Sequence, residues 1–145
     1  MTRQDINYYE DLGIEGQVCP PQDAVFGDGE TTYFRVVKTN PVVETCFHSH
    51  RRKFPEKPYP DECDARSLSV AKSLEGLSGY FRSPAFKKKI ALIGVVTLSP
   101  MDGRVKQTGA SYHYSWWRSA AFDLSTVRVQ EIDPSVYWTK NDQKI

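Results

Sequence analysis

The longest apolar run in the chain, from Ile90 to Leu98, constrains the fold more than any other segment. It has no alternating polar positions, so we expect a strand that is buried on both faces in the middle of a sheet. The run is too short to cross a membrane, which takes about 20 residues. Because such a strand must be covered, the rest of the chain has to supply further strands and helices.

Three other segments have the composition of strands. Residues 31–37 are rich in β-branched and aromatic side chains, and residues 126–132 alternate between apolar and polar ones. Residues 104–107 follow a turn at 100–103 and are a third, short candidate. We therefore expect a small mixed or mostly antiparallel sheet.

Two segments indicate helices. Apolar side chains recur at helical spacing over residues 68–81, and Ser67 or Ser69 stands where the first turn needs a cap. The apolar residues within 42–53 also fit helical spacing, which favours a short helix there. Two helices beside a small sheet predict a single-domain α+β fold.

Length and composition predict one domain with a segment on each side. A chain of 145 residues fits a single domain, and an aromatic content of 12% favours a packed fold over disorder. Glycines and prolines interrupt residues 1–30. We expect an irregular leader over residues 1–30, one domain over 31–138 and a tail over 139–145.

The cysteines and the N-terminus bear on location. Three cysteines at irregular spacing, Cys19, Cys46 and Cys63, argue against a disulfide framework, so we expect reduced thiols. The N-terminus lacks the apolar stretch of a signal peptide, and we expect a cytoplasmic protein without a membrane partner. The net charge of +1 does not indicate binding to nucleic acid.

Four residues carry side chains that zinc prefers, namely Cys46, His48, His50 and Cys63. Their spacing matches no paired pattern of a structural zinc site, and three of them diverge if their segment is helical. We therefore expect no metal. The simpler interpretation is a pair of surface histidines beside a buried cysteine.

Aromatic side chains are concentrated in residues 111–118, which we expect to form a loop. The candidate ligand-binding residues are Tyr112, Tyr114, Trp116 and Trp117. Such rings stack on nucleobases or on nicotinamide, and His113 among them is a candidate general acid or base. The alternative is structural: at least one tryptophan fills the core, and the indole N–H groups bond to the backbone.

Three further polar residues lie where a sheet can bring them together: Arg35 in the first strand, Ser69, and Glu131 in the last strand. Arg35 shares its strand face with apolar neighbours, so its charge needs a partner. The simpler interpretation is an Arg35–Glu131 ion pair between two strands. The functional one makes these residues, with His113, a catalytic group.

The order of Tyr-Phe-Arg-Val, Ser67-Leu68-Ser69 and a late glutamate resembles the arginine–serine–glutamate layout of ADP-ribosyltransferases. This resemblance implies that Arg35 and Ser69 help to hold NAD. It also implies that Glu131 stabilises the ribosyl oxocarbenium ion and orients the acceptor. NAD would be a substrate, and the resemblance adds no other cofactor.

A second resemblance covers most of residues 33–123. Phe34-Arg35-Val36-Val37, Leu68-Ser69-Val70 and the His-x-x-Trp-Trp pattern from His113 are similar to a group of small uncharacterised bacterial proteins. Two functions follow as hypotheses. One is an ADP-ribosyltransferase-like domain that binds NAD or another nucleotide. The other is a non-catalytic module whose segment 111–118 contacts a protein partner.

Overall fold

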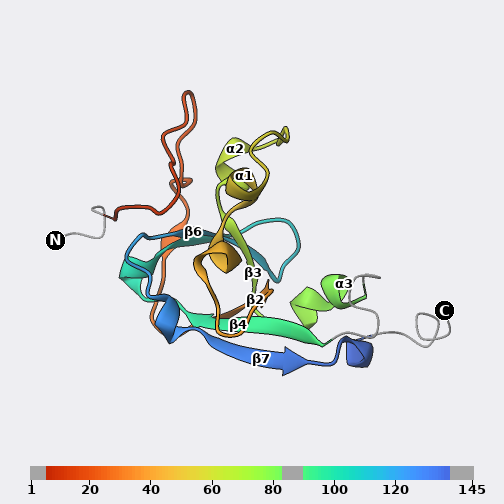
Figure 1. Ribbon diagram of the computed structural model, residues 1–145. Coiled ribbons are helices and arrows are strands. Elements are labelled where there is room, and N and C mark those ends of the chain that lie inside the picture. The colour runs from red at the N-terminus through yellow and green to blue at the C-terminus, as the bar shows by residue number, and fades with distance from the viewer. Residues whose placement is uncertain (1–5, 83–89, 138–145) are drawn as a thin grey trace.

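The computed structural model describes residues 6–82 and 90–137. Within these ranges the chain forms one seven-stranded sheet in the order β1-β5-β6-β3-β2-β4-β7, and every neighbouring pair is antiparallel. Short helices accompany the sheet (Figure 1). The expected α+β fold is confirmed, with the sheet as its dominant part.

The strands are short and the helices shorter. The strands are β1 (Val25–Phe26), β2 (Thr32–Val37), β3 (Leu68–Ala71), β4 (Ala91–Thr97), β5 (Gly103–Gln107), β6 (His113–Arg118) and β7 (Arg128–Ile132). The α-helices are α1 (His50–Lys53), α2 (Glu62–Ala65) and α3 (Ser78–Phe81). Single 3-10 turns are η2 (Glu44–Phe47), η3 (Glu75–Leu77), η5 (Pro100–Asp102), η6 (Leu124–Thr126) and η7 (Pro134–Tyr137).

The strands expected over 31–37, 90–98, 104–107 and 126–132 are confirmed as β2, β4, β5 and β7. Strand β4 is buried along most of its length on both faces, as its apolar run predicts. It is second from the sheet edge, however, and β3 occupies the centre. The expected central position of β4 is therefore wrong.

The helix expected over 68–81 is the main error of the sequence prediction. Its first part is strand β3, and only the part from Glu75 onward is helical, as η3 and α3. Leu68 and Val70 are each 1% exposed, while Ser69 between them is half-buried, which is the alternation of a strand. Pairing with β2 and β6 on both sides outweighs the weak helical preference of four residues.

The expected helix over 42–53 is present in two pieces, η2 and α1. The break falls at His48 and Ser49, where the backbone is extended. The Ser49 hydroxyl accepts a hydrogen bond from the backbone N–H of Arg52 and so caps α1. The break turns α1 across the sheet, and this places His50 beside β2 and β3.

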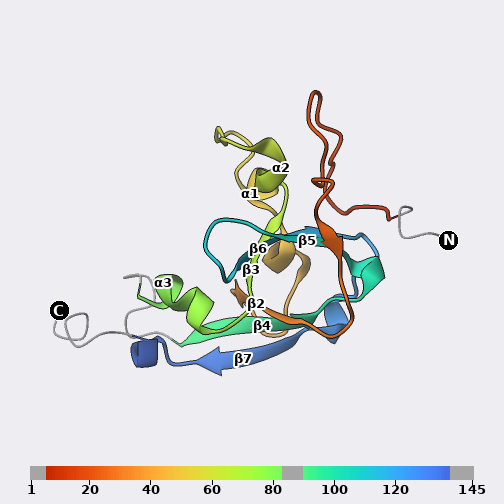
Figure 2. The ribbon, with the colours of Figure 1, turned by 180° about the vertical axis from the view of Figure 1, so that it is seen from behind.

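The leader is largely irregular but it is tied to the domain. Strand β1 runs beside β5 (Figure 2) and pairs with it, and Tyr8 forms a bridge with Ser119. Cys19 forms a disulfide with Cys63, so the expectation of reduced thiols throughout is wrong. The odd number of cysteines gave no indication of this pair. Its members are 44 positions apart and meet only because the leader folds back onto α2. The expected tail over 139–145 lies outside the described residues.

Both tryptophans of the aromatic segment lie in the interior. Trp116 packs edge-on against Phe122, with ring centroids 4.8 Å apart, in the main core between β-strands and η2. Trp117 belongs to a smaller cluster with Ala24 and the disulfide. Within the described ranges, no helix combines the length and the apolar composition needed to cross a membrane.

Candidate functional site

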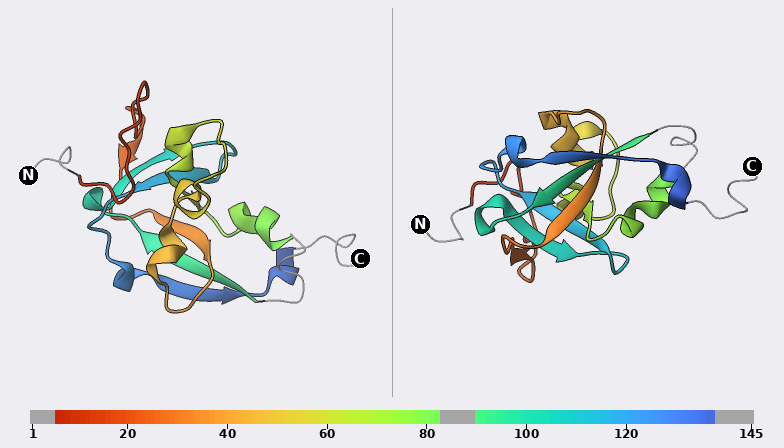
Figure 3. Two further views of the ribbon diagram at one scale, coloured as in Figure 1. Left: turned by 45° about the horizontal axis from the view of Figure 1, so that its top comes forward. Right: turned by 90° about the horizontal axis from the view of Figure 1, so that it is seen from below.

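The sheet opens between β2 and β3. These strands share a single residue pair, Phe34 with Ala71, whereas β2 pairs with β4 at six successive positions. Figure 3 shows β5 and β6 diverging from β2, β4 and β7, with the short helices lying across the opening. The opening leaves space for side chains from both halves of the sheet.

A cleft of two adjoining cavities occupies this opening. Their volumes are about 310 and 190 Å³, and the larger alone is within the range of about 300–1,000 Å³ usual for small-molecule sites. The residues that line both cavities are Arg35, His50, Ser69 and His113. These four therefore stand at the junction of the cleft.

Three of the four predicted catalytic residues meet here. Arg35 comes from β2, Ser69 from β3 and His113 from β6, which are consecutive strands of the sheet. Ser69 pairs across the strands with Ser115, two positions from His113, so Ser69 and His113 lie on one face. The sequence placed these residues in separate elements, and the sheet brings them together.

Glu131 does not join them. It is exposed on β7, the edge strand, and lines neither cavity of the cleft. Strand β4 separates it from β2, where Arg35 pairs with Gly94. No ion pair joins Arg35 to Glu131 within the described ranges, so the expected salt bridge is also wrong. The alternation of β7 gave no information on which strand would be its neighbour.

The Arg35 guanidinium bonds to the backbone across the opening. Its Nε donates to the carbonyl of Cys46 at 3.0 Å, and one terminal nitrogen donates to the carbonyl of Ser69 at 2.8 Å. These bonds connect η2 to β3 through a side chain of β2. They hold the positive charge at the junction of the cleft.

The aromatic segment is a strand instead of a loop, and this removes most of its proposed role. Trp116 and Trp117 are 0% and 1% exposed, and their indole N–H groups donate to the carbonyls of Asp102 and Cys63. The structural interpretation is thus confirmed for both. Tyr114 packs against Tyr33 inside the sheet. Neither tryptophan can stack on a ligand.

Tyr112 is the one aromatic candidate of this segment beside the cleft. It is 44% exposed, and its ring lies so close to Gly76 that a Cβ on that glycine would stand 2.8 Å from Cδ2 of the tyrosine. Gly76 lines the smaller cavity. The Tyr112 ring therefore packs against a residue of the cleft wall, although it lines neither cavity itself.

One side of the cleft is positively charged. Lys53 and His50 of α1 face Arg35 across the smaller cavity. Burial lowers the pKa of His50, and the charges of Arg35 and Lys53 lower it further. Burial likewise lowers the pKa of His48, with a further contribution from Arg52. The sequence indicated for both histidines either a metal site or a surface position, and not a place in a cleft.

The opposite side is acidic and comes from a segment that the sequence reasoning left aside. Asp61 caps α2 by accepting the backbone N–H of Asp64, and both residues line the larger cavity with Tyr59. Glu62 of the same helix binds Arg51 of α1 at 2.6 Å. This ion pair joins the helix that carries the basic side to the helix that carries the acidic one.

The four possible zinc ligands do not converge. Cys63 is in the disulfide, and the thiol of Cys46 lies 3.3 Å from the Thr39 hydroxyl. Among residues 6–82 and 90–137, no group of three or more histidines, cysteines, aspartates or glutamates could hold a metal ion. His48 and His50 instead line the cleft.

A third cavity of about 430 Å³ lies on the far side of Lys53. Valines of β2, Cys46 and Phe54 form much of its wall, and Arg35, Ser69 and His113 are not part of it. His48 and Lys53 line this cavity as well as the cleft. No family model, curated protein or solved structure matches the chain.

Proposed function

We propose that this protein binds a nucleotide of the NAD type in the cleft at the sheet opening. The observation that carries the proposal is the meeting of Arg35, Ser69 and His113 from three consecutive strands at the junction of one cleft. The sequence singled out these residues before their positions in space were known. A meeting of this kind favours a shared ligand over three unrelated structural roles.

The charges of the cleft suit such a ligand. Phosphate groups are anionic, and Arg35, Lys53 and the imidazole of His50 surround the smaller cavity. Ribose hydroxyls donate hydrogen bonds, and the carboxylates of Asp61 and Asp64 accept them in the larger cavity. A molecule with phosphates beside a sugar matches both sides.

The smaller cavity also has an apolar wall. Val36, Val70 and Leu77 contribute to it, and Tyr112 lies against Gly76 at its side. A planar base or a nicotinamide ring packs favourably on such a surface. Glu131, the carboxylate of the ADP-ribosyltransferase-like layout, does not line the cleft, so the proposal is binding of the nucleotide and does not include transfer of ADP-ribose.

Calorimetric titration of the full chain with NAD and with ADP-ribose tests this proposal. We expect both to bind, and we expect Lys53→Gln to weaken binding by about tenfold, equivalent to about 1.4 kcal/mol. Lys53 is exposed on α1, so this change leaves the core intact. Glu131→Gln is the matched control and keeps the affinity. Absence of heat up to millimolar ligand would contradict the proposal.

The second hypothesis, a protein-interaction module that uses residues 111–118, has less support because the second half of this segment, from Ser115 to Arg118, is buried in β6. This hypothesis predicts that Tyr112→Ala abolishes binding of a protein partner. It also predicts that neither the wild type nor the variant binds a nucleotide. The resemblance to small bacterial proteins remains a prediction.

A cytoplasmic location also remains a prediction, and the disulfide offers a direct measurement. Disulfides persist mainly in oxidising compartments. Maleimide labelling of the denatured protein, taken directly from cells, should modify three cysteines if the location is reducing. It should modify Cys46 alone if the Cys19–Cys63 bond is formed in the cell.

A further inference from the structure

The His113 ring is anchored through one of its two nitrogens. Nδ1 lies 2.8 Å from the backbone carbonyl oxygen of Thr108 and 3.0 Å from the hydroxyl of the same residue. Because a carbonyl oxygen only accepts, Nδ1 must carry a proton. In the neutral ring, Nε2 therefore holds the lone pair.

A chain of hydroxyl groups continues from this anchor. With Nδ1–H as donor, the Thr108 hydroxyl can donate its own proton to Ser115 Oγ at 2.8 Å. Ser115 in turn donates to Oδ1 of Asp64 at 2.6 Å. The chain ends on a carboxylate, which accepts in its ionised form, so each group donates toward Asp64.

The middle of this chain is shielded from water. Ser115 is 1% exposed and lies in β6 opposite Ser69, while Asp64 reaches the chain from α2 at the cleft wall. Hydrogen bonds away from solvent are stronger, and chains of them polarise one another. The buried Ser115 hydroxyl therefore links the anchor of the imidazole to Asp64, whose side chain is exposed.

The other nitrogen is directed away from this anchor. His113 lines both cavities, and no residue in the described ranges forms a hydrogen bond with its Nε2. The two other histidines of the cleft differ. Nε2 of His48 lies 3.1 Å from the Tyr9 hydroxyl, and the His50 ring stacks on Tyr59. Among the three histidines of the cleft, in the described residues, His113 alone has a ring nitrogen held by a backbone carbonyl, which fixes the lone pair on the other nitrogen.

We propose that Nε2 of His113 is the proton acceptor of the cleft, for a water molecule or for a ligand hydroxyl group. Thr108, Ser115 and Asp64 are positioning residues that hold the ring in the accepting form. The inference rests on the proposed function only for the identity of the group that loses its proton.

Nitrogen-15 NMR of the unliganded protein tests the ring directly. Neutral histidine in water favours the tautomer with the proton on Nε2, whereas we expect His113 to carry it on Nδ1. The ring-nitrogen chemical shifts distinguish the two forms. A neutral His113 protonated on Nε2 would overturn the proposal whatever the ligand proves to be.

A cycle of variants tests the chain. We expect Asp64→Asn and Ser115→Ala each to raise the share of neutral His113 that carries its proton on Nε2, because each removes the terminal acceptor or the link to it. The double variant should raise this share no further than Asp64→Asn alone. Additive changes in this share would show that Asp64 acts through space, and the chain would then be refuted. Thr108→Val breaks the same chain if the buried Ser115→Ala variant does not fold.

Carbethoxylation by diethylpyrocarbonate, mapped by mass spectrometry, tests access from the cleft. The reagent attacks an unprotonated ring nitrogen, so His113 should react, with His48 and His50 as references in the same molecule. An unreactive His113 in a folded protein would overturn its role. If His113 reacts but ADP-ribose gives no protection, the nucleotide proposal fails and the proton acceptor stands.

Discussion

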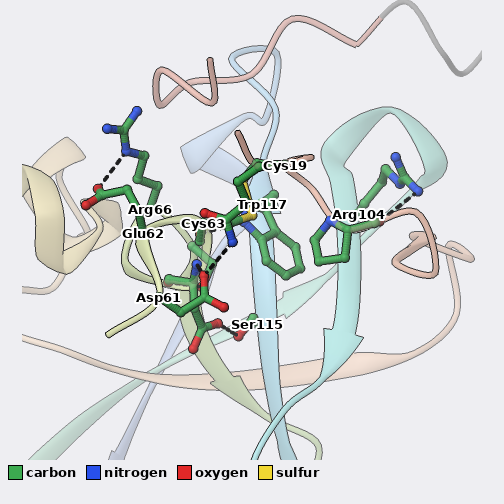
Figure 4. Close-up of a disulfide and its surroundings, with 12 residues drawn as sticks. Cys19, Asp61, Glu62, Cys63, Arg66, Arg104, Ser115 and Trp117 are labelled. Atoms are coloured by element: carbon green, nitrogen blue, oxygen red, sulfur yellow. Dashed lines mark hydrogen bonds and ion pairs between the residues drawn. A yellow bond between two sulfur atoms is a disulfide. The ribbon is translucent and has the colours of Figure 1, made fainter. Parts of the chain in front are cut away.

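The indole N–H of Trp117 donates a hydrogen bond of 3.0 Å to the backbone carbonyl of Cys63, the residue that forms the disulfide with Cys19 (Figure 4). Strand β6 is thereby joined to α2 and to the leader at one buried point. The next residue after Cys63 is Asp64, which ends the hydrogen-bond chain of His113. The residue that ties α2 to β6 and to the leader, Cys63, is therefore adjacent in the sequence to Asp64, which ends the hydrogen-bond chain of the cleft.

Removal of the disulfide should destabilise the fold. The bond closes a loop between positions 44 residues apart, which restricts the unfolded chain. We expect the double variant Cys19→Ala/Cys63→Ala to lower the free energy of unfolding by about 2–4 kcal/mol. Urea denaturation of the oxidised protein measures it. Reductant should lower the urea midpoint of the wild type and leave that of the double variant unchanged. Equal urea midpoints of the two proteins without reductant would contradict the prediction.

Gly103 should be intolerant of a side chain. Its φ is +129°, and an added Cβ would run into the carbonyl oxygen of Trp117 on the neighbouring strand. Gly16 has a φ of +76° but open space around it, so Gly16→Ala should cost only the backbone strain, about 1–2 kcal/mol. Gly103→Ala should cost about 1–3 kcal/mol more. Thermal or urea unfolding of both variants measures the two losses of stability. Equal losses for Gly16→Ala and Gly103→Ala would contradict the contact between the added Cβ at position 103 and the Trp117 carbonyl.

Stability should fall in acid through Glu62. Hydrogen bonds from Arg51 and then Arg66 lower the pKa of Glu62 to about 2. A carboxylate whose pKa is lower in the folded state stabilises fully above its ordinary value, 4.5, and loses this effect as the pH falls toward 2. The free energy of unfolding should therefore decline less steeply over that window in Glu62→Gln than in the wild type.

The control for this change is Glu75→Gln, an exposed glutamate in η3. It should follow the wild-type curve. Unfolding in urea at several values of pH between 5 and 2.5 provides the comparison. Parallel curves for wild type and Glu62→Gln would show that the ion pairs of Glu62 with Arg51 and Arg66 add no stability.

Binding of ADP-ribose should strengthen as the pH falls. Burial and the charges of Arg35 and Lys53 hold the pKa of His50 below its usual value, so the free imidazole is mostly neutral at pH 7.5. A bound phosphate beside it raises that pKa, and each unit of increase gives up to tenfold tighter binding at low pH. Titrations at pH 7.5 and 5.5 should show the rise, and His50→Gln should reduce it. If the affinity of His50→Gln for ADP-ribose changes with pH as steeply as that of the wild type, His50 is not the origin of the effect.

Prediction from sequence succeeded where local composition alone decides an element. β2, β4, β5 and β7 contain β-branched or apolar runs that fit a strand whatever their neighbours are. Arg35, Ser69 and His113, three of the predicted catalytic residues, line one cleft, and their catalytic role stays a prediction. The sequence prediction failed for Glu131, because alternation marks a strand face without stating which strand lies next to it.

The sequence by itself determined that this chain has a packed sheet with a fully covered strand, and that at least one tryptophan belongs to the core. The tertiary structure decided that β3 is the central strand, that β2 and β3 part after one residue pair, and that Cys19 reaches Cys63. It also decided that Asp64 of α2 meets Ser115 beside His113. The physical reason is the separation along the sequence over which each effect acts. Propensity and burial patterns act over a few residues, whereas the disulfide and the hydrogen-bond chain join residues about 50 positions apart.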